Sequence, residues 1–406
     1  MRIFKTTLSL ILCMAVFLSI NVFVSAKTVS SECDISDIAV PIASDNVEAP
    51  VGTVLDIKAR SAILLEPDTL TILYDSNSDE KLPPASITKI MSLILIMEAI
   101  DRGDFTTEDV VSASDHAASM GGSQIWLKPG ESMTVDDLLK ATVIASANDA
   151  TVALAEKVAG SEEGFVSMMN EKAKAIGMTN TVFKNATGLD AEGHISTAHD
   201  VALMSAELLR HPLIKKYSTV WMDSLRDGKS ELVNTNKLVR FYEGTTGLKT
   251  GTTSNAGYCL AASAARDGME LVAVIMGGET SPARFEGAKK LLDYGFSNYS
   301  VTKIEPDFNE DTKIKVNGGV QNELPLSAGE GFSLLLKKSE RAEIKQTVNL
   351  PKSVSAPVEK GETIGEIEVY SGDNLIGTID IVAAESIKKM NFLTAFRFMI
   401  SGLLTP

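Results

Sequence analysis

The sequence Pro84-Ala85-Ser86-Ile87-Thr88-Lys89 leads into a strongly aliphatic stretch that continues to Ile100. This stretch is too short to span a bilayer, and its apolar residues on every side predict a helix buried within a globular core. Pro84 suits the start of such a helix because its missing N–H is not needed there. Ser86 and Lys89 lie three positions apart, so their side chains project from one face and can meet.

The Ser86–Lys89 pair predicts a serine nucleophile activated by a lysine base. A serine at a helix N-terminus sits at the positive end of the helix dipole, but its hydroxyl still needs a base. The Lys89 amine can take that part if burial keeps it neutral. The same spacing recurs at Ser300–Lys303 and Ser386–Lys389, so alone it equally fits a helix-capping serine beside a surface lysine.

Two later motifs favour the catalytic interpretation. Ser146-Ala147-Asn148 follows the first motif, and Lys249-Thr250-Gly251, the only Lys-Thr-Gly in the chain, comes later still. This set, in this order, is typical of penicillin-binding proteins and class A β-lactamases. A second Ser-x-Asn at Ser44-Asp45-Asn46 precedes Ser86 and fails the order.

The region around these motifs predicts an α+β fold, with helices on a mainly antiparallel sheet and the site between sheet edge and helices. Capping boxes at Thr134–Asp137 and Thr197–Asp200 begin helices, and another helix pattern follows Asn148, which places Ser146–Asn148 at a junction. Asp267-Gly268 joins two strands in a hairpin, so Lys249 is expected on an edge strand just before it. Further elements are expected at 62–65 and 70–74 (a hairpin), 150–158 and 288–294 (helices), and 257–264 and 271–276 (strands).

After about residue 300 the pattern changes to alternating strands, which predicts a small β-sandwich domain without a catalytic motif. The expected strands cover 314–316, 344–348, 364–369 and 375–382.

The N-terminus predicts export. Arg2 and Lys5 precede an apolar run from Leu8 to Val24, and Val24-Ser25-Ala26 is a small-x-small cleavage pattern, so we expect a signal peptide over 1–26. An uncleaved anchor is the alternative. The full chain carries a net charge of −15, and cleavage makes it more acidic by two, which argues against nucleic acid as a partner.

Neither a metal nor a cofactor is expected. The four histidines have no metal-ligand spacing, and after cleavage only Cys33 and Cys259 remain. Two cysteines make no disulfide framework, and Cys259 falls in an apolar strand pattern, so we expect a small buried thiol there.

The last twenty residues predict a helix lying on a membrane surface. Polar residues at helical spacing form one narrow stripe that includes Arg397, and Lys388 and Lys389 precede the apolar part. Such a segment is short for crossing a bilayer but suits the interface. A terminal helix packed on its own domain is the alternative.

Taken together, the chain after residue 50 resembles the serine-type D-alanyl-D-alanine carboxypeptidases, low-molecular-mass penicillin-binding proteins of peptidase family S11. The resemblance rests on the three motifs, on Asn185-Ala186-Thr187-Gly188-Leu189-Asp190, and on the order of domains. That order is a signal peptide (1–26), a lead-in (27–50), a serine transpeptidase-like catalytic domain (51–299), a β-rich domain (300–384) and an amphipathic helix (385–406).

The resemblance implies a role for each motif residue. Ser86 would be acylated and Lys89 would be its base, while Ser146 and Asn148 would relay a proton and hold the substrate amide. Lys249 and Thr250 would bind the terminal carboxylate, and the N–H groups of Ser86 and Thr252 would hold the oxyanion. The implied substrate is the peptidoglycan stem ending in D-Ala-D-Ala, β-lactams would be covalent inhibitors, and the enzyme would work on the outer face of the cytoplasmic membrane.

Two alternative functions remain open. A β-lactamase shares the acylation motifs, but class A enzymes carry a deacylating glutamate, commonly in Glu-x-x-Leu-Asn, and Glu231-Leu232-Val233-Asn234 is the nearest string here. A wall-binding protein with a dead site is the non-enzyme alternative. Arg284 could assist the carboxylate site or lie on the surface.

Overall fold

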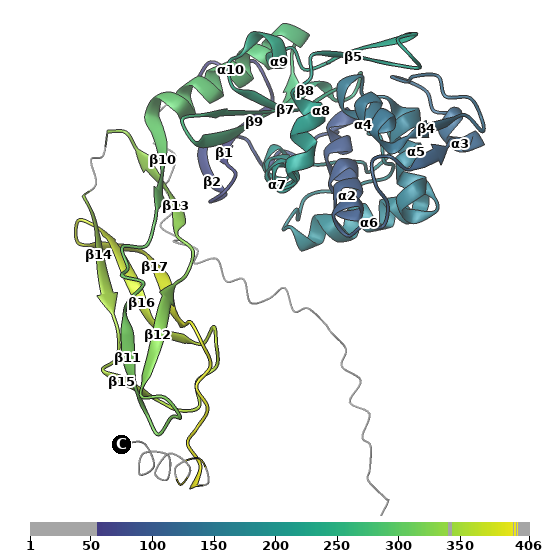
Figure 1. The fold of residues 1–406 in the computed structure, drawn as a ribbon. Coiled ribbons are helices and arrows are strands. Elements are labelled where there is room, and N and C mark those ends of the chain that lie inside the picture. The colour runs from purple at the N-terminus through teal and green to yellow at the C-terminus, as the bar shows by residue number, and fades with distance from the viewer. Residues whose placement is uncertain (1–54, 340–342, 393, 395, 397–406) are drawn as a thin grey trace, which may run out of the picture. The chain divides into compact units, whose positions relative to one another are not determined.

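The computed structural model describes residues 55–339, 343–392, 394 and 396 (Figure 1). Residues 1–54, which include the predicted signal peptide, the lead-in and Cys33, lie outside the described residues. The predicted boundary between lead-in and catalytic domain therefore stays a prediction.

The catalytic region is built on a five-stranded antiparallel sheet with the strand order β2-β1-β9-β8-β7. Both predicted hairpins are present, and the Asp267-Gly268 turn has positive φ at both residues, as a tight hairpin turn requires. β7 lies at the edge, as expected for the strand carrying Lys249. The strands are β1 (Ser61–Glu66), β2 (Thr71–Ser76), β7 (Thr245–Thr253), β8 (Gly257–Arg266) and β9 (Met269–Gly278).

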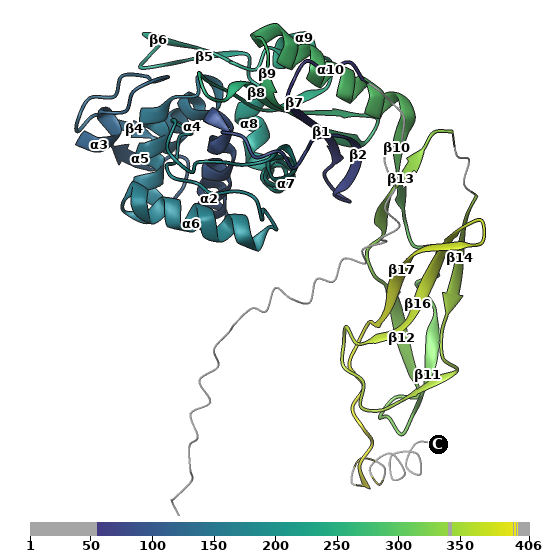
Figure 2. The same ribbon diagram turned by 180° about the vertical axis from the view of Figure 1, so that it is seen from behind.

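Both faces of this sheet are covered by helices, which explains why its central strands are almost continuously apolar. In β1, Ala62 and Leu64 pack in the cluster that includes α10 (Ser281–Asn298). Ile63 and Leu65 point to the opposite cluster, which includes α2 (Lys89–Asp101) and α7 (Ala198–Leu209). Figures 1 and 2 show α10 on one side of the sheet and α2 and α7 on the other.

The Ser86 segment forms the buried helix that the sequence predicts, with one difference at its start. α2 is buried along nearly its whole length, so it has no polar face. The α-helix begins at Lys89, and Ser86 lies in a 3₁₀ turn, η2 (Ala85–Thr88), that precedes it. In a 3₁₀ turn, side chains three positions apart eclipse one another, which brings Ser86 and Lys89 together more directly than an α-helix would.

The remaining helices surround α2. Thr134 and Thr197 accept hydrogen bonds from the backbone N–H groups of Asp137 and Asp200, which confirms the predicted caps. Larger helices are α4 (Val135–Ile144), α5 (Asn148–Ala159) and α6 (Glu162–Ala175). Short elements are β3 (Val110–Ser112), α3 (Asp115–Ala118), β4 (Ser132–Thr134), η3 (Pro212–Ile214), α8 (Lys215–Ser218), β5 (Met222–Leu225), β6 (Ser230–Val233) and α9 (Leu238–Phe241).

The C-terminal domain is β-rich, as predicted. Its own core contains Val316, Leu326, Ile367 and Ile381. A six-stranded sheet has the order β14-β16-β17-β12-β11-β15, and β10 pairs with β13 in a separate two-stranded sheet. The strands are β10 (Tyr299–Ile304), β11 (Lys313–Asn317), β12 (Glu323–Ala328), β13 (Phe332–Lys337), β14 (Ile344–Asn349), β15 (Ser353–Ser355), β16 (Thr363–Ser371) and β17 (Asn374–Ala383).

The expectation of a helix beginning at residue 385 is wrong at its N-terminal end. Ile387 exchanges two backbone hydrogen bonds with Val358, and Met390 N–H donates to the carbonyl of Gly318, so this stretch is extended. Burial of Ile387 in the core of the C-terminal domain accounts for the difference. Most of the later tail lies outside the described residues, and among those described no helix is both long and apolar enough to cross a bilayer.

This placement predicts that Ile387 stabilises the C-terminal domain whereas Phe392 does not. Ile387 is 1% exposed and Phe392 is 86% exposed. Ile387→Ala should lower the free energy of unfolding by about 2–5 kcal/mol, since it leaves a cavity in a packed core. Phe392→Ala is the matched control and should change it little. Denaturant unfolding of the two variants measures the difference, and equal effects would contradict the core assignment.

Candidate active site

Lys89, the first residue of α2, lies at the centre of the candidate site. Its side chain is fully buried, and its Nζ lies 3.2 Å from Ser86 Oγ, 2.6 Å from Asn148 Oδ1 and 2.8 Å from the carbonyl oxygen of Thr187. The structure thus brings Lys89 together with Asn148 and Thr187, which are distant from it in sequence. Ser86, Asn148 and Thr187 lie on three different segments, and each provides an acceptor that orients the amine.

Burial also sets the protonation state of Lys89. Removal from water lowers the pKa of its ammonium well below the usual value, and the nearby positive charge of Lys249 lowers it further, while Asp149 opposes the shift. A neutral amine 3.2 Å from a serine hydroxyl can accept its proton. The direction of this pKa shift is the one that a lysine base requires.

The turn that carries Ser86 is tightly enclosed. Ala85 is buried and has φ +49°, a conformation that costs a non-glycine residue free energy and is concentrated at functional sites. A Cβ on Gly188 would lie 1.8 Å from the Ala85 carbonyl oxygen, and one on Gly251 would lie 3.0 Å from Ser86 N. Only residues without a side chain allow these two segments to approach the nucleophile so closely.

The Ser146–Asn148 motif lies between α4 and α5, as predicted. Ser146 is buried with φ +63°, and its hydroxyl makes no hydrogen bond within the described part of the chain. Asn148 is not the helix cap, because Ala147 occupies that position. Its Nδ2 instead donates to the Gly121 carbonyl at 2.6 Å, which aims Oδ1 at Lys89.

Asp149 fixes the loop that faces Asn148. Its buried carboxylate accepts hydrogen bonds from the backbone N–H groups of Ile125 and Leu127. The same loop supplies the Ser123 carbonyl, which accepts from Asn148 N at 2.7 Å. Asn148 and Asp149 thus both hold the 123–127 loop in place.

On β7, Lys249 is also buried, with Nζ 3.2 Å from the Thr250 carbonyl oxygen. Burial, assisted by the positive charge of Arg284, lowers its pKa to about 7. The Thr250 hydroxyl donates to Thr235 at 2.7 Å, and the hydroxyl of the exposed Thr252 donates to the Gly251 carbonyl at 2.7 Å.

Arg284 is not a surface residue, which decides one of the open alternatives. It lies buried on α10, and its Nη1 donates to the Gly251 carbonyl at 3.0 Å and to Thr252 Oγ1 at 2.9 Å. It also donates to the Cys259 carbonyl on β8 at 3.2 Å. These contacts hold the end of the β7 motif. Cys259 is a free buried thiol, as predicted, and burial raises its pKa to about 11.

A cavity of about 290 Å³ adjoins the Ser86 turn. Asp190 on its wall accepts hydrogen bonds from Thr253 Oγ1 at 2.8 Å and Asn255 Nδ2 at 3.0 Å, which ties this wall to the end of β7. Within the described residues, no group of three or more His, Cys, Asp or Glu could hold a metal ion. The cavity is lined by Pro83, Pro84, Ala85, Gly188–Glu192, His194 and Asn255.

The contact of the Thr187 carbonyl with Lys89 is not predicted by the sequence, although Thr187 lies in Asn185–Asp190, one of the segments that carry the family resemblance. Asn185 Oδ1 accepts from Thr187 N and Gly188 N, a turn in which an Asn side chain imitates a backbone acceptor. The Asn-x-x-Gly string is a signal for such a turn, but nothing in it shows which carbonyl faces the lysine.

Two family models match the chain. The model described as D-alanyl-D-alanine carboxypeptidase matches residues 45–280, and the one described as the C-terminal domain of penicillin-binding protein 5 matches residues 300–389.

Curated relatives and solved structures agree with these matches. The chain is 46% identical to the D-alanyl-D-alanine carboxypeptidase DacF of Bacillus subtilis, over 83% of this chain and 88% of the relative. It is 36% identical to DacC of Escherichia coli, over 86% and 88%. Penicillin-binding protein 5 from Haemophilus influenzae matches with a TM-score of 0.71 and 30% identity, covering 83% of this chain and 99% of that one.

A further structure, penicillin-binding protein D2 from Listeria monocytogenes in its ampicillin-bound form, matches with a TM-score of 0.55 and 30% identity. It covers 60% of this chain and 99% of that one. Sequence, fold and the assembled motifs agree, and the chain belongs to the D-alanyl-D-alanine carboxypeptidases, the serine peptidases of family S11.

Proposed function

We propose that this enzyme removes the terminal D-alanine from peptidoglycan stem peptides through an acyl-enzyme on Ser86. The observation that carries the assignment of Ser86 is the 3.2 Å contact between its Oγ and the Nζ of Lys89, an amine whose pKa burial lowers well below its usual value. This contact supplies a nucleophile and a base in one place.

In the acylation step, Lys89 takes the proton from Ser86 Oγ while that oxygen attacks the carbonyl carbon of the penultimate residue. The backbone N–H groups of Ser86 and Thr252 hold the oxyanion. The C–N bond then breaks, the leaving D-alanine amine takes the proton, with Ser146 as relay, and an ester to Ser86 remains. Water, deprotonated by Lys89, hydrolyses this ester and regenerates the serine.

Recognition of the terminal carboxylate falls to Lys249 and Thr250. A carboxylate needs a fixed cation and hydroxyl donors, and both residues lie on β7, the strand whose Gly251 packs against the turn of Ser86. Asn148 holds the substrate amide, and its side chain is already fixed between Lys89 and Gly121.

Covalent inhibition by β-lactams belongs to the same proposal. The Listeria monocytogenes relative has been solved in ampicillin-bound and cefotaxime-bound forms. A β-lactam presents an amide carbonyl and a carboxylate, so the same serine, oxyanion donors and lysine serve both ligands.

The alternatives explain the chain less well. Glu231, in the string nearest to a β-lactamase deacylation motif, lies exposed on the β5–β6 hairpin. A catalytically inactive wall-binding protein would not need a buried lysine in contact with a serine.

The first prediction concerns acylation. Ser86→Ala should abolish labelling by a fluorescent penicillin because the nucleophile is lost. Lys89→Ala should reduce labelling by at least a hundredfold while the thermal melt stays cooperative, since general-base catalysis typically contributes 10²–10⁴-fold. Labelling of Ser86→Ala at the wild-type rate would show that the nucleophile is assigned wrongly.

The second prediction concerns substrate selectivity. Lys249→Ala should lower kcat/KM for a peptide with a free C-terminal carboxylate, because a desolvated charge contact is lost. The expected loss of transition-state stabilisation is about 2–5 kcal/mol. A C-terminally amidated analogue should lose far less. Equal losses on the two substrates would rule out carboxylate recognition by Lys249.

The pH profile provides a matched control for the same prediction. With a pKa of about 7, Lys249 is cationic below that pH and loses its proton as the pH rises through it. For the wild-type enzyme, kcat/KM on the carboxylate substrate should therefore fall above about pH 7, whereas the amidated substrate should show no such fall.

We also propose that the chain is exported and held on the outer face of the cytoplasmic membrane by its C-terminal tail. The signal-like N-terminus and the polar stripe along the tail support this location. Burial of Arg397 near mid-bilayer would cost about 2.5–3.5 kcal/mol on insertion scales, so a helix in the interface is favoured over a spanning one.

The third prediction tests this anchor. A chain that ends at Met390 keeps the buried Ile387 and should stay folded and active, but should no longer sediment with membranes after signal cleavage. The full-length mature chain is the control. A truncated chain that still sediments would show that the tail is not the anchor.

A further inference from the structure

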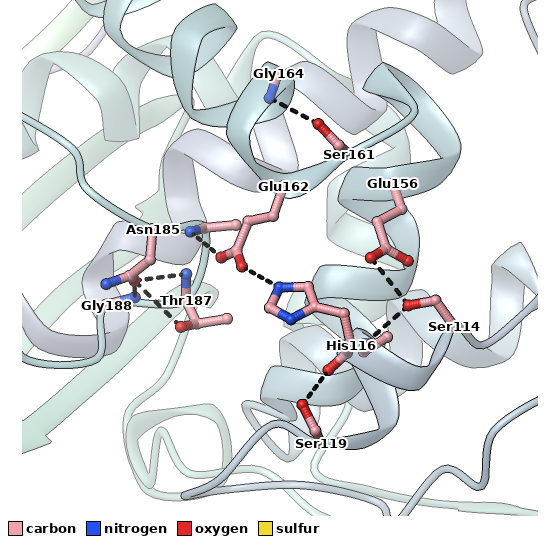
Figure 3. Close-up of polar contacts among 12 residues, drawn as sticks. Ser114, His116, Ser119, Glu156, Ser161, Glu162, Gly164, Asn185, Thr187 and Gly188 are labelled. Atoms are coloured by element: carbon pink, nitrogen blue, oxygen red, sulfur yellow. Dashed lines mark hydrogen bonds and ion pairs between the residues drawn. The ribbon is translucent and has the colours of Figure 1, made fainter.

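Glu162, the first residue of α6, connects two segments that the proposed mechanism has not used (Figure 3). Its Oε1 accepts a hydrogen bond from the backbone N–H of Ala186 at 2.9 Å. Its Oε2 accepts one from Nε2 of His116 at 2.7 Å. The side chain is only 12% exposed, so this carboxylate is held between α3 and the 185–188 loop.

The 185–188 loop supplies an acceptor to the catalytic lysine. Ala186 is fully buried, and the carbonyl of the next residue, Thr187, lies 2.8 Å from Lys89 Nζ. Ser92, one turn after Lys89 on α2, donates to the Ala186 carbonyl at 2.6 Å. The peptide groups on either side of Ala186 are thus fixed, one by Glu162 and the other by α2.

The partner of Glu162 is itself fixed. His116 lies on α3, whose N-cap residue Ser114 donates from its hydroxyl to Glu156 of α5 at 3.0 Å (Figure 3). The hydrogen bond to Glu162 raises the pKa of His116, which favours its charged form beside the carboxylate. α5 begins with Asn148, whose side chain also accepts from Lys89, so two of the three acceptors of the lysine amine, Asn148 and Thr187, are connected through α3.

We propose that Glu162 is a positioning residue for Lys89, because its carboxylate fixes the 185–188 loop with the Thr187 carbonyl aimed at the lysine amine. The inference rests on the proposed function, in which Lys89 is the base for Ser86.

Removal of the carboxylate leaves a buried N–H without an acceptor. The loop can satisfy that group only by moving, and the next carbonyl moves with it. A small displacement of a catalytic group lowers the rate even when the fold persists. We expect Glu162→Ala to acylate about tenfold more slowly, a difference of about 1.4 kcal/mol in the barrier.

The test compares acylation of the full chain by a fluorescent penicillin in three variants. Glu162→Ala removes the acceptor, whereas Glu162→Gln keeps a carbonyl oxygen for Ala186 and should recover at least half of the wild-type rate. Glu163→Ala is the matched control, because it removes a carboxylate from the same helical turn without touching the loop, and its rate should equal wild type. A role that depended only on negative charge would not be rescued by Gln.

Three results would overturn the proposal: Glu162→Ala at the wild-type rate, an equal loss in Glu163→Ala, or no rescue by Gln. If Glu162→Ala fails to fold, Ser92→Ala, which releases the loop at its other side, replaces it and should also slow acylation. Failure of the proposed function is distinguishable, since it would appear as full acylation in Lys89→Ala.

Discussion

The structure around the active site depends on one unfavourable placement, the burial of the Lys89 amine. A neutral amine in a protein interior must be supplied with hydrogen-bond partners, and here each partner comes from a different segment: the η2 turn, the start of α5 and the 185–188 loop. These segments must therefore be held in fixed relative positions. The helical packing around α2 serves that requirement as much as it serves stability.

The sheet contributes the opposite wall. β7 reaches the nucleophile only because Gly251 has no side chain, and Arg284 secures the strand from the α10 side. The positive charge of the nearby Lys249 adds to burial in lowering the pKa of Lys89, the proposed base. In the proposed mechanism, the lysine that binds the carboxylate thus also lowers the pKa of the lysine that acts as base.

Sequence patterns predicted the elements that depend on local residue preferences. The apolar run of α2, the Thr134 and Thr197 caps and the Asp267-Gly268 hairpin were all predictable, because each follows from local residue preferences. The roles of the Thr187 carbonyl and the Glu162 carboxylate were not, since one belongs to the backbone and the other depends on a contact between distant segments. The tail beginning at residue 385 was misassigned at its start because the polar stripe matched a helix, whereas burial of Ile387 in the β-rich domain decided the conformation.

The close approach of Gly188 and Gly251 to the Ser86 turn limits how this enzyme can evolve under antibiotic selection. A larger residue at either position would collide with Ala85 or with the backbone of the nucleophile itself. A mutation that narrowed the cleft here to exclude a drug would therefore also displace the turn that holds Ser86 next to Lys89. Substitutions that leave the serine turn in place are instead expected at the exposed rim, for example at Leu189 on the cavity wall.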